Sequence, residues 1–192
     1  MKVGLFFGSF NPIHTGHLIL AQAALDMADL NQIWFVVSPG SPDKDYSKLL
    51  HEFDRLDLVR EAIRDNPDFR ASDVEFSLPK PSYTYLTLRK LKEKHPAYQF
   101  FILMGADNYR NLGRWKNAEE IRQQVEFIVY PRHGAEENPE KADNELVHWI
   151  EAPLLEISAT QVRSMIRKGQ SVRYLIPEDA RKLIESKGFY RD

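Results

Sequence analysis

The sequence predicts an α/β protein built on a Rossmann-like parallel sheet, with helices on both faces and a small helical subdomain at the C-terminal end. Short continuous apolar runs recur along the chain, which is typical of strands buried on both faces of a parallel sheet. Segments with helical apolar spacing alternate with these runs, as successive β-α-β units require. The 192 residues contain no internal repeat or long linker, so we expect one domain, 1–192, with a core over about 1–155 and a helical part over about 156–192.

The first forty residues predict one β-α-β unit. Residues 3–7 form a short apolar run that ends at Gly8, which indicates the first buried strand. Helical spacing begins at Gly16 and predicts a helix that packs an apolar stripe on the sheet. Residues 33–37 then predict a second buried strand, reached by a right-handed crossover. The loop over 38–48 leaves the carboxyl end of that strand, where ligands usually bind.

The middle of the chain continues this alternation. In order, we expect a helix around 56–63, an alternating strand over 69–78, a helix over 83–94, a buried strand over 100–104, a short helical turn after Gly105, a helix over 118–124 and a buried strand over 125–130. Residues 133–145 are charged and poor in apolar side chains, so they predict a surface excursion without chemistry.

The C-terminal end predicts two short helices. Residues 160–168 form a helical segment that stops at Gly169. A second segment over 177–187 opens with a proline in its first turn and stops at Gly188. We expect these two helices to form part of the same ligand-binding cleft as the sheet.

Composition and charge restrict the class of protein. The formal net charge is −2, so no global positive field attracts nucleic acid or an anionic membrane. The absence of cysteine excludes disulfides, thiolate zinc sites and a cysteine nucleophile. The first residues lack a signal-peptide pattern and no apolar segment is long enough to span a bilayer, so a cytoplasmic protein is expected.

The segment over 8–17, Gly-Ser-Phe-Asn-Pro-Ile-His-Thr-Gly-His, predicts a phosphate site. It joins the carboxyl end of the first strand to the amino end of the first helix, where free N–H groups and the helix dipole attract anions. Gly8 and Gly16 would let the backbone approach an anion closely. His14 and His17 would face the same pocket and donate hydrogen bonds to phosphate oxygens that gain charge in the transition state.

Two other interpretations of the histidines are possible. A zinc pair also has short spacing, but the segment offers no nearby third ligand such as cysteine. A single histidine could simply cap the helix or fill the loop. Two histidines between flanking glycines favour phosphate binding over both alternatives.

Five ordered segments resemble a known enzyme family. His14-Thr-Gly-His17 resembles the H-x-G-H signature of the nucleotidyltransferase superfamily, and four further stretches resemble nicotinate mononucleotide adenylyltransferase. These are Ser38-Pro-Gly-Ser-Pro-Asp-Lys44, Pro81-Ser-Tyr-Thr-Tyr-Leu-Thr-Leu88, Gly105-Ala-Asp-Asn108 with Trp115, and Ile157-Ser-Ala-Thr-Gln-Val-Arg163. The resemblance covers nearly the whole chain. It implies adenylyl transfer from ATP, which carries Mg²⁺, to nicotinate mononucleotide, giving nicotinate adenine dinucleotide and pyrophosphate.

The resemblance also implies a set of site residues. The catalytic residues would be His14, His17, Lys44 and Arg163; ATP would be bound by Gly8, Ser9, Phe10, Gly16, Asp107, Ile157, Ser158 and Thr160; the mononucleotide would be bound by Asn11, Ser82, Tyr83, Thr84 and Trp115. No residues dedicated to a metal ion are expected.

Physical chemistry fits these roles. Ser158, Thr160 and Arg163 at a helix start offer hydroxyls, N–H groups and a guanidinium to phosphate oxygens. The N–H groups and hydroxyl at 82–84 could hold a carboxylate, which nicotinate carries and nicotinamide lacks. An indole at Trp115 could stack on a pyridine ring.

Each feature also has an ordinary structural interpretation. Ser158, the 82–84 segment and Asp107 could be helix caps, Trp115 a core residue, and Lys44 a solvated lysine beside an equally suitable Lys48.

Three rival functions remain at this stage. The chain could adenylylate nicotinamide mononucleotide, act on another phosphate such as phosphopantetheine, or be a nucleotide-binding regulator without turnover. The 82–84 segment and Trp115 argue against phosphopantetheine, while the two histidines, Lys44 and Arg163 argue against a regulator. A homo-oligomer is compatible with the sequence.

Overall fold

The computed structural model describes residues 1–40, 49–131, 146–153 and 155–191. In these residues a parallel sheet has the order β3-β2-β1-β4-β5-β6. The strands are β1 (Lys2–Gly8), β2 (Gln32–Val37), β3 (Phe69–Ser72), β4 (Gln99–Gly105), β5 (Glu126–Tyr130) and β6 (Val147–Trp149). The helices are α1 (Thr15–Met27), α2 (Glu52–Ala62), α3 (Thr84–Lys94), α4 (Ala106–Arg110), α5 (Ala118–Arg122), α6 (Ala159–Arg167) and α7 (Glu178–Lys187), with short 3₁₀ helices η2 (Val74–Ser77) and η3 (Leu112–Arg114).

The strand order creates a switch point beside β1. The chain first moves outward from β1 through β2 to β3, then returns to place β4 on the other side of β1. Leu5 of β1 therefore lies between Trp34 of β2 and Ile102 of β4. In open parallel sheets, ligands bind at the carboxyl ends of the strands where the order reverses. The end of β1 is thus the expected position of a site.

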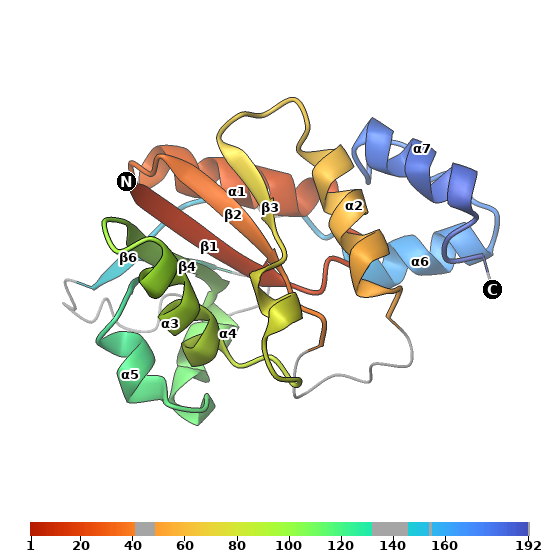
Figure 1. Cartoon of the computed structure of the whole chain (residues 1–192). Coiled ribbons are helices and arrows are strands. Elements are labelled where there is room, and N and C mark those ends of the chain that lie inside the picture. Colours follow the sequence, from red (N-terminus) through yellow and green to blue (C-terminus); the bar gives the residue numbers. More distant parts are fainter. Residues whose placement is uncertain (41–48, 132–145, 154, 192) are drawn as a thin grey trace.

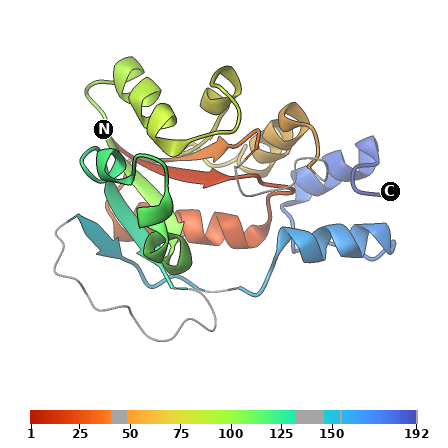
Figure 2. The same ribbon diagram turned by 90° about the horizontal axis from the view of Figure 1, so that it is seen from below.

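Alternate residues of the strands fill two apolar clusters, one on each face of the sheet. Phe6 packs with residues of α1, α2 and α7, whereas Leu5 packs with residues of α3 and α5. Figure 2 shows the sheet between α1 and α3. The expected Rossmann-like fold with helices on both faces is confirmed.

The two C-terminal helices lie beyond the carboxyl ends of the strands. Figures 1 and 2 show α6 and α7 at that end, and α7 packs against α2. Helix α6 begins after Ser158, whose Oγ accepts a hydrogen bond from the N–H of Gln161 (3.1 Å). Helix α7 ends at Gly188, which has a φ of 67°. In the described residues, no helix combines the length and apolarity needed to cross a bilayer.

One expectation about the strands was wrong, and one strand was not expected. The strand expected over 69–78 ends at Ser72, and residues 74–77 form η2. Ser72 pairs with Val36, the penultimate residue of β2, so hardly any backbone of β2 remains for a longer strand to pair with. The three-residue strand β6 was not expected, because its residues 147–149 are only half-buried and give no apolar run. The excursion expected over 133–145 lies outside the described residues.

Candidate functional site

A cavity of about 1140 Å³ opens at the carboxyl edge of the sheet. It is lined by the turn after β1, the start of the loop after β2, the end of β4 and the amino ends of α3 and α6. This volume exceeds the roughly 300–1,000 Å³ of ordinary small-molecule sites.

The segment from the end of β1 to the start of α1 contributes the largest group of expected residues. Gly8, Ser9, Phe10, Asn11, His14, Gly16 and His17 all line the cavity. The two imidazole rings stack, with centroids 3.6 Å apart and an angle of 27° between the planes. The expectation that His14 and His17 face one pocket is therefore correct.

Main-chain hydrogen bonds determine the tautomer of His17. The backbone N–H of His14 donates to Nδ1 of His17 (3.1 Å), and the N–H of His17 donates to the carbonyl of His14 (2.9 Å). A nitrogen that accepts a hydrogen bond carries no proton, so in the neutral ring the proton is on Nε2. His17 is thereby prepared to act as a donor through Nε2.

His14 is almost completely buried. Only 7% of the residue is exposed, and its Nδ1 has no hydrogen-bond partner in the described part of the chain. Burial lowers the pKa of His14 from 6.5 to about 4. The ring is consequently neutral at pH 7 in the free protein.

The two glycines of the turn make room for neighbouring rings. A Cβ added to Gly8 would lie 2.8 Å from the ring of Phe10, and one added to Gly16 would lie 3.1 Å from Nδ1 of His14. Phe10 itself has a φ of 43°, which is strained for a bulky residue. The rings of Phe10 and His14 therefore occupy the space that a side chain at Gly8 or Gly16 would need.

The amino end of α6 supplies a second group of expected residues. Ile157, Ser158 and Thr160 line the cavity. Arg163 is not among the lining residues: its guanidinium donates to the carbonyl oxygen of Asn11 (2.6 Å) and approaches the hydroxyl of Thr160 (3.3 Å). Helix α6 is thus tied to the turn after β1 through Arg163.

The amino end of α3 forms the third wall. Ser82, Tyr83 and Thr84 line the cavity, and the N–H of Ser82 donates to the carbonyl of Gly40 (3.1 Å). The N–H of Ser82 is therefore engaged, while helix geometry leaves the first N–H groups of α3, starting at Thr84, without intrahelical acceptors.

A buried carboxyl lies behind this wall. Glu75 is 2% exposed, lines the cavity and accepts a hydrogen bond from the hydroxyl of Thr87 (2.9 Å). Burial raises the pKa of Glu75, and the hydroxyls of Ser38, Ser82 and Thr87 act in the opposite direction. The hydrogen bond from Thr87 joins η2 to the first turn of α3.

The remaining expected residues separate into three cases. Trp115, which follows η3, lines the cavity, as does Asn108 of α4. Asp107 is not among the lining residues. Lys44, like Lys48, lies outside the described residues. In the described ranges, no group of three or more His, Cys, Asp or Glu side chains could hold a metal ion.

Sequence reasoning missed three polar residues around this site: the buried Arg55 and Glu75, and the half-buried Tyr190, whose hydroxyl is buried. Arg55 and Tyr190 lie under the turn after β1 and Glu75 under α3. One signal was available for Arg55. It precedes Leu58, Val59 and Ala62 by three, four and seven residues, which places it on the buried stripe of its helix. Nothing in the local sequence indicates that the hydroxyl of Tyr190 is buried.

We expect the protein to tolerate the loss of the Tyr190 hydroxyl. Its hydroxyl is buried and has no hydrogen-bond partner in the described residues. Burial raises the pKa of the phenol, against the effect of the nearby positive charges of Arg55 and Arg163. Tyr190→Phe removes an unsatisfied polar atom, so the free energy of unfolding should stay equal or rise by about 1 kcal/mol in urea titrations. A fall in the free energy of unfolding of more than about 1 kcal/mol would show that the Tyr190 hydroxyl has a hydrogen-bond partner in solution.

Sequence comparison places the chain in one protein family. Residues 5–165 match the family model described as cytidylyltransferase-like. A protein from Cytophaga hutchinsonii named probable nicotinate-nucleotide adenylyltransferase is 48% identical over 190 residues, covering 99% of this chain and 98% of its own. A protein of the same name from Flavobacterium johnsoniae is 44% identical over 192 residues, with both chains fully covered.

Solved structures show the same fold. The chain is similar to Plasmodium falciparum nicotinic acid mononucleotide adenylyltransferase complexed with NaAD, with a TM-score of 0.79, 22% identity, and coverage of 98% of this chain and 97% of that one. The structure of that enzyme complexed with APC gives a TM-score of 0.81 at 20% identity, covering 98% and 96%.

Proposed function

Because the chain belongs to the nicotinate-nucleotide adenylyltransferases of the cytidylyltransferase-like family, we propose that its cavity binds ATP and nicotinate mononucleotide side by side and joins them. The chain is a nucleotidyltransferase that transfers an adenylyl group in NAD biosynthesis. The observation that carries the assignment of the site is the stacked pair of His14 and His17 at the start of α1, in the same cavity as the amino ends of α3 and α6.

The proposed reaction is an in-line displacement. An oxygen of the mononucleotide 5′-phosphate forms a bond to the α-phosphorus of ATP, the bond between that phosphorus and the bridging oxygen to the β-phosphorus breaks, and pyrophosphate leaves with Mg²⁺. The Mg²⁺ enters with the triphosphate as part of the substrate. Phosphate is already a nucleophile at neutral pH, so no general base is required.

The protein contributes position and charge. In this proposal Nε2–H of His17 donates to phosphate oxygens that gain charge as pyrophosphate departs. The amino end of α6 with Ser158 and Thr160 holds the triphosphate, and Arg163 and Lys44 neutralise its charge. The hydrogen bond from Arg163 to the carbonyl of Asn11 holds the turn after β1 beside α6.

The mononucleotide is proposed to lie against α3. The amino end of that helix, around Tyr83 and Thr84, offers N–H donors and a favourable dipole to the nicotinate carboxylate. Nicotinamide presents an uncharged amide there, whose NH₂ group opposes the same donors. Trp115 on the cavity wall is placed to stack on the pyridine ring.

The experiment is a pyrophosphate-release assay with ATP, Mg²⁺ and one mononucleotide at a time. The acid should be the preferred acceptor, with kcat/KM exceeding that of the amide by at least about tenfold, since the donors are arranged for an anion. Equal rates on acid and amide would contradict the role of α3. If the protein binds ATP but releases no pyrophosphate with any acceptor, it would instead be a nucleotide-binding regulator.

A further inference from the structure

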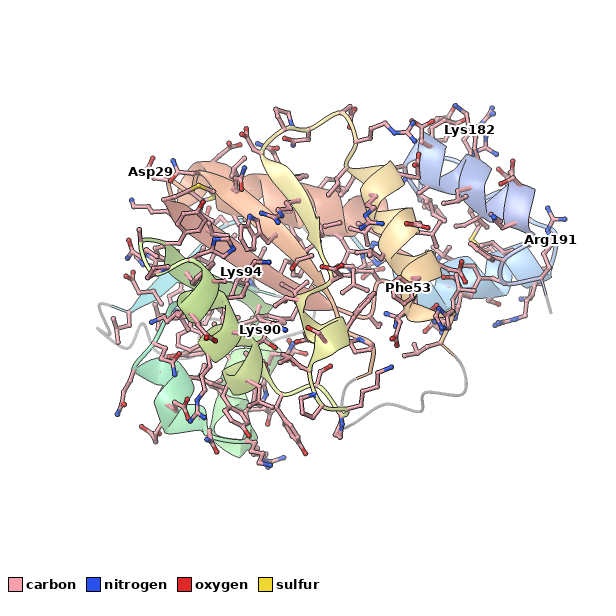
Figure 3. The ribbon with its side chains drawn as sticks, viewed as in Figure 1. Asp29, Phe53, Lys90, Lys94, Lys182 and Arg191 are labelled. Carbon is pink, nitrogen blue, oxygen red and sulfur yellow. The ribbon has the colours of Figure 1, made fainter. Side chains whose placement is uncertain are left out.

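Arg55 is a buried cation whose hydrogen bonds all end on main-chain carbonyls in the described part of the chain. The residue is 1% exposed, although Phe53, two positions earlier on α2, is 55% exposed at the surface (Figure 3). Nη1 donates to the carbonyls of Ser9 (2.5 Å) and Ser38 (2.8 Å). Nη2 donates to the carbonyl of Pro39 (3.3 Å), and Nε to that of Leu50 (2.8 Å).

These carbonyls belong to the segments that form the cavity wall. Ser9 follows β1, and Ser38 and Pro39 follow β2, at neighbouring carboxyl ends of the sheet. A carbonyl oxygen that pointed into a phosphate site would repel the anion. Arg55, which is absent from the cavity lining, holds three carbonyl oxygens of these segments by hydrogen bonds.

The planarity of the peptide group determines where the partner atoms point. In a trans peptide, the C=O of one residue and the N–H of the next point in opposite directions. With the carbonyls of Ser9 and Pro39 directed at Arg55, the N–H groups of Phe10 and Gly40 point away from it. Ser9 and Phe10 line the cavity, so the N–H of Phe10 is the polar end of that peptide available to a bound anion.

We propose that Arg55 is a positioning residue for adenylyl transfer, which turns the Ser9–Phe10 peptide after β1 so that the N–H group of Phe10 faces the phosphates of ATP. This inference rests on the proposed binding of the triphosphate at the turn after β1. Arginine, unlike lysine, keeps its charge when buried and presents donors in a rigid fork. The geometry therefore requires the guanidinium and not merely a positive charge.

The first test compares Arg55→Lys with Arg60→Lys. Arg60 lies on the same helix, pairs with Asp57 and has a 55% exposed side chain, so its substitution controls for the change of residue type. A single ammonium cannot span the carbonyls of Ser9, Ser38 and Pro39. We expect kcat/KM for ATP to fall about 10²-fold in Arg55→Lys, because small misplacements at a reacting centre have effects of this size. Arg60→Lys should remain within about twofold of the wild type.

The pattern of kinetic constants separates positioning from simple stabilisation. If Arg55 only stabilised the fold, Arg55→Lys would lower the melting temperature and the active fraction but leave KM for ATP unchanged per folded molecule. The proposal requires weaker binding of inorganic pyrophosphate and a raised KM for ATP in folded Arg55→Lys. A folded variant with wild-type values of both would overturn it.

A second measurement uses the wild-type protein and stays decisive if Arg55→Lys does not fold. Inorganic pyrophosphate is titrated into ¹⁵N-labelled protein, and the amide resonance of Phe10 should shift with the same dissociation constant as those of His14 and His17. Shifts at His14 and His17 without a shift at Phe10 would overturn the role of Arg55 alone. No shift anywhere in residues 8–17 would overturn the proposed triphosphate site as well.

Discussion

His17→Ala should lower kcat/KM for ATP by about 10²–10³-fold, because it removes one donor to the charge that develops on the departing pyrophosphate. The effect should be mainly on kcat, since the interaction strengthens in the transition state. The measurement is pyrophosphate release under saturating nicotinate mononucleotide. The far-UV circular dichroism spectrum should stay unchanged.

The matched control is His95→Ala. His95 follows α3, near the amino ends of the strands, and its ring stacks on Tyr98. It does not line the cavity. This variant should retain the wild-type kcat. Near-normal pyrophosphate release from purified His17→Ala would contradict the assigned role of His17, whatever its effect on stability.

The fold followed from the sequence where apolar runs were continuous. Residues 33–37 and 100–104 are buried on both faces, so their local pattern alone determined the strand assignment. The strand over 69–78 failed because its length depends on its partner: β3 can only pair as far as β2 extends. The edge strand β6 is short and half-buried, and its pairing with β5 leaves no trace in its composition.

The site followed from the sequence where its residues are contiguous. His14 is the residue before α1 and His17 lies in the first turn of that helix, so a single short segment brings their rings together. Arg55 could not be assigned this way, because its acceptors come from three separate segments that meet only in the folded sheet. The tautomer of His17 likewise depends on a backbone hydrogen bond that no motif encodes.

Acidification should destabilise the free protein through His14. Its pKa is about 4 in the folded protein and near 6.5 when exposed, so the unfolded chain binds the proton first. The stability associated with neutral His14 is therefore complete above pH 6.5 and is lost as the pH falls toward 4. The interval corresponds to about 3 kcal/mol. Urea titrations at several pH values between 4 and 7 measure this loss.

Comparison with His14→Gln isolates the histidine from the carboxylates that titrate in the same range. Glutamine cannot take up a proton, so the free energy of unfolding of the variant should depend less on pH than that of the wild type, by about 3 kcal/mol over this interval. Parallel curves for the two proteins would show that His14 keeps an ordinary pKa. The predicted difference implies that His14 meets the incoming triphosphate as a neutral ring, and that any positive charge on it must arise after the anion has entered the cavity.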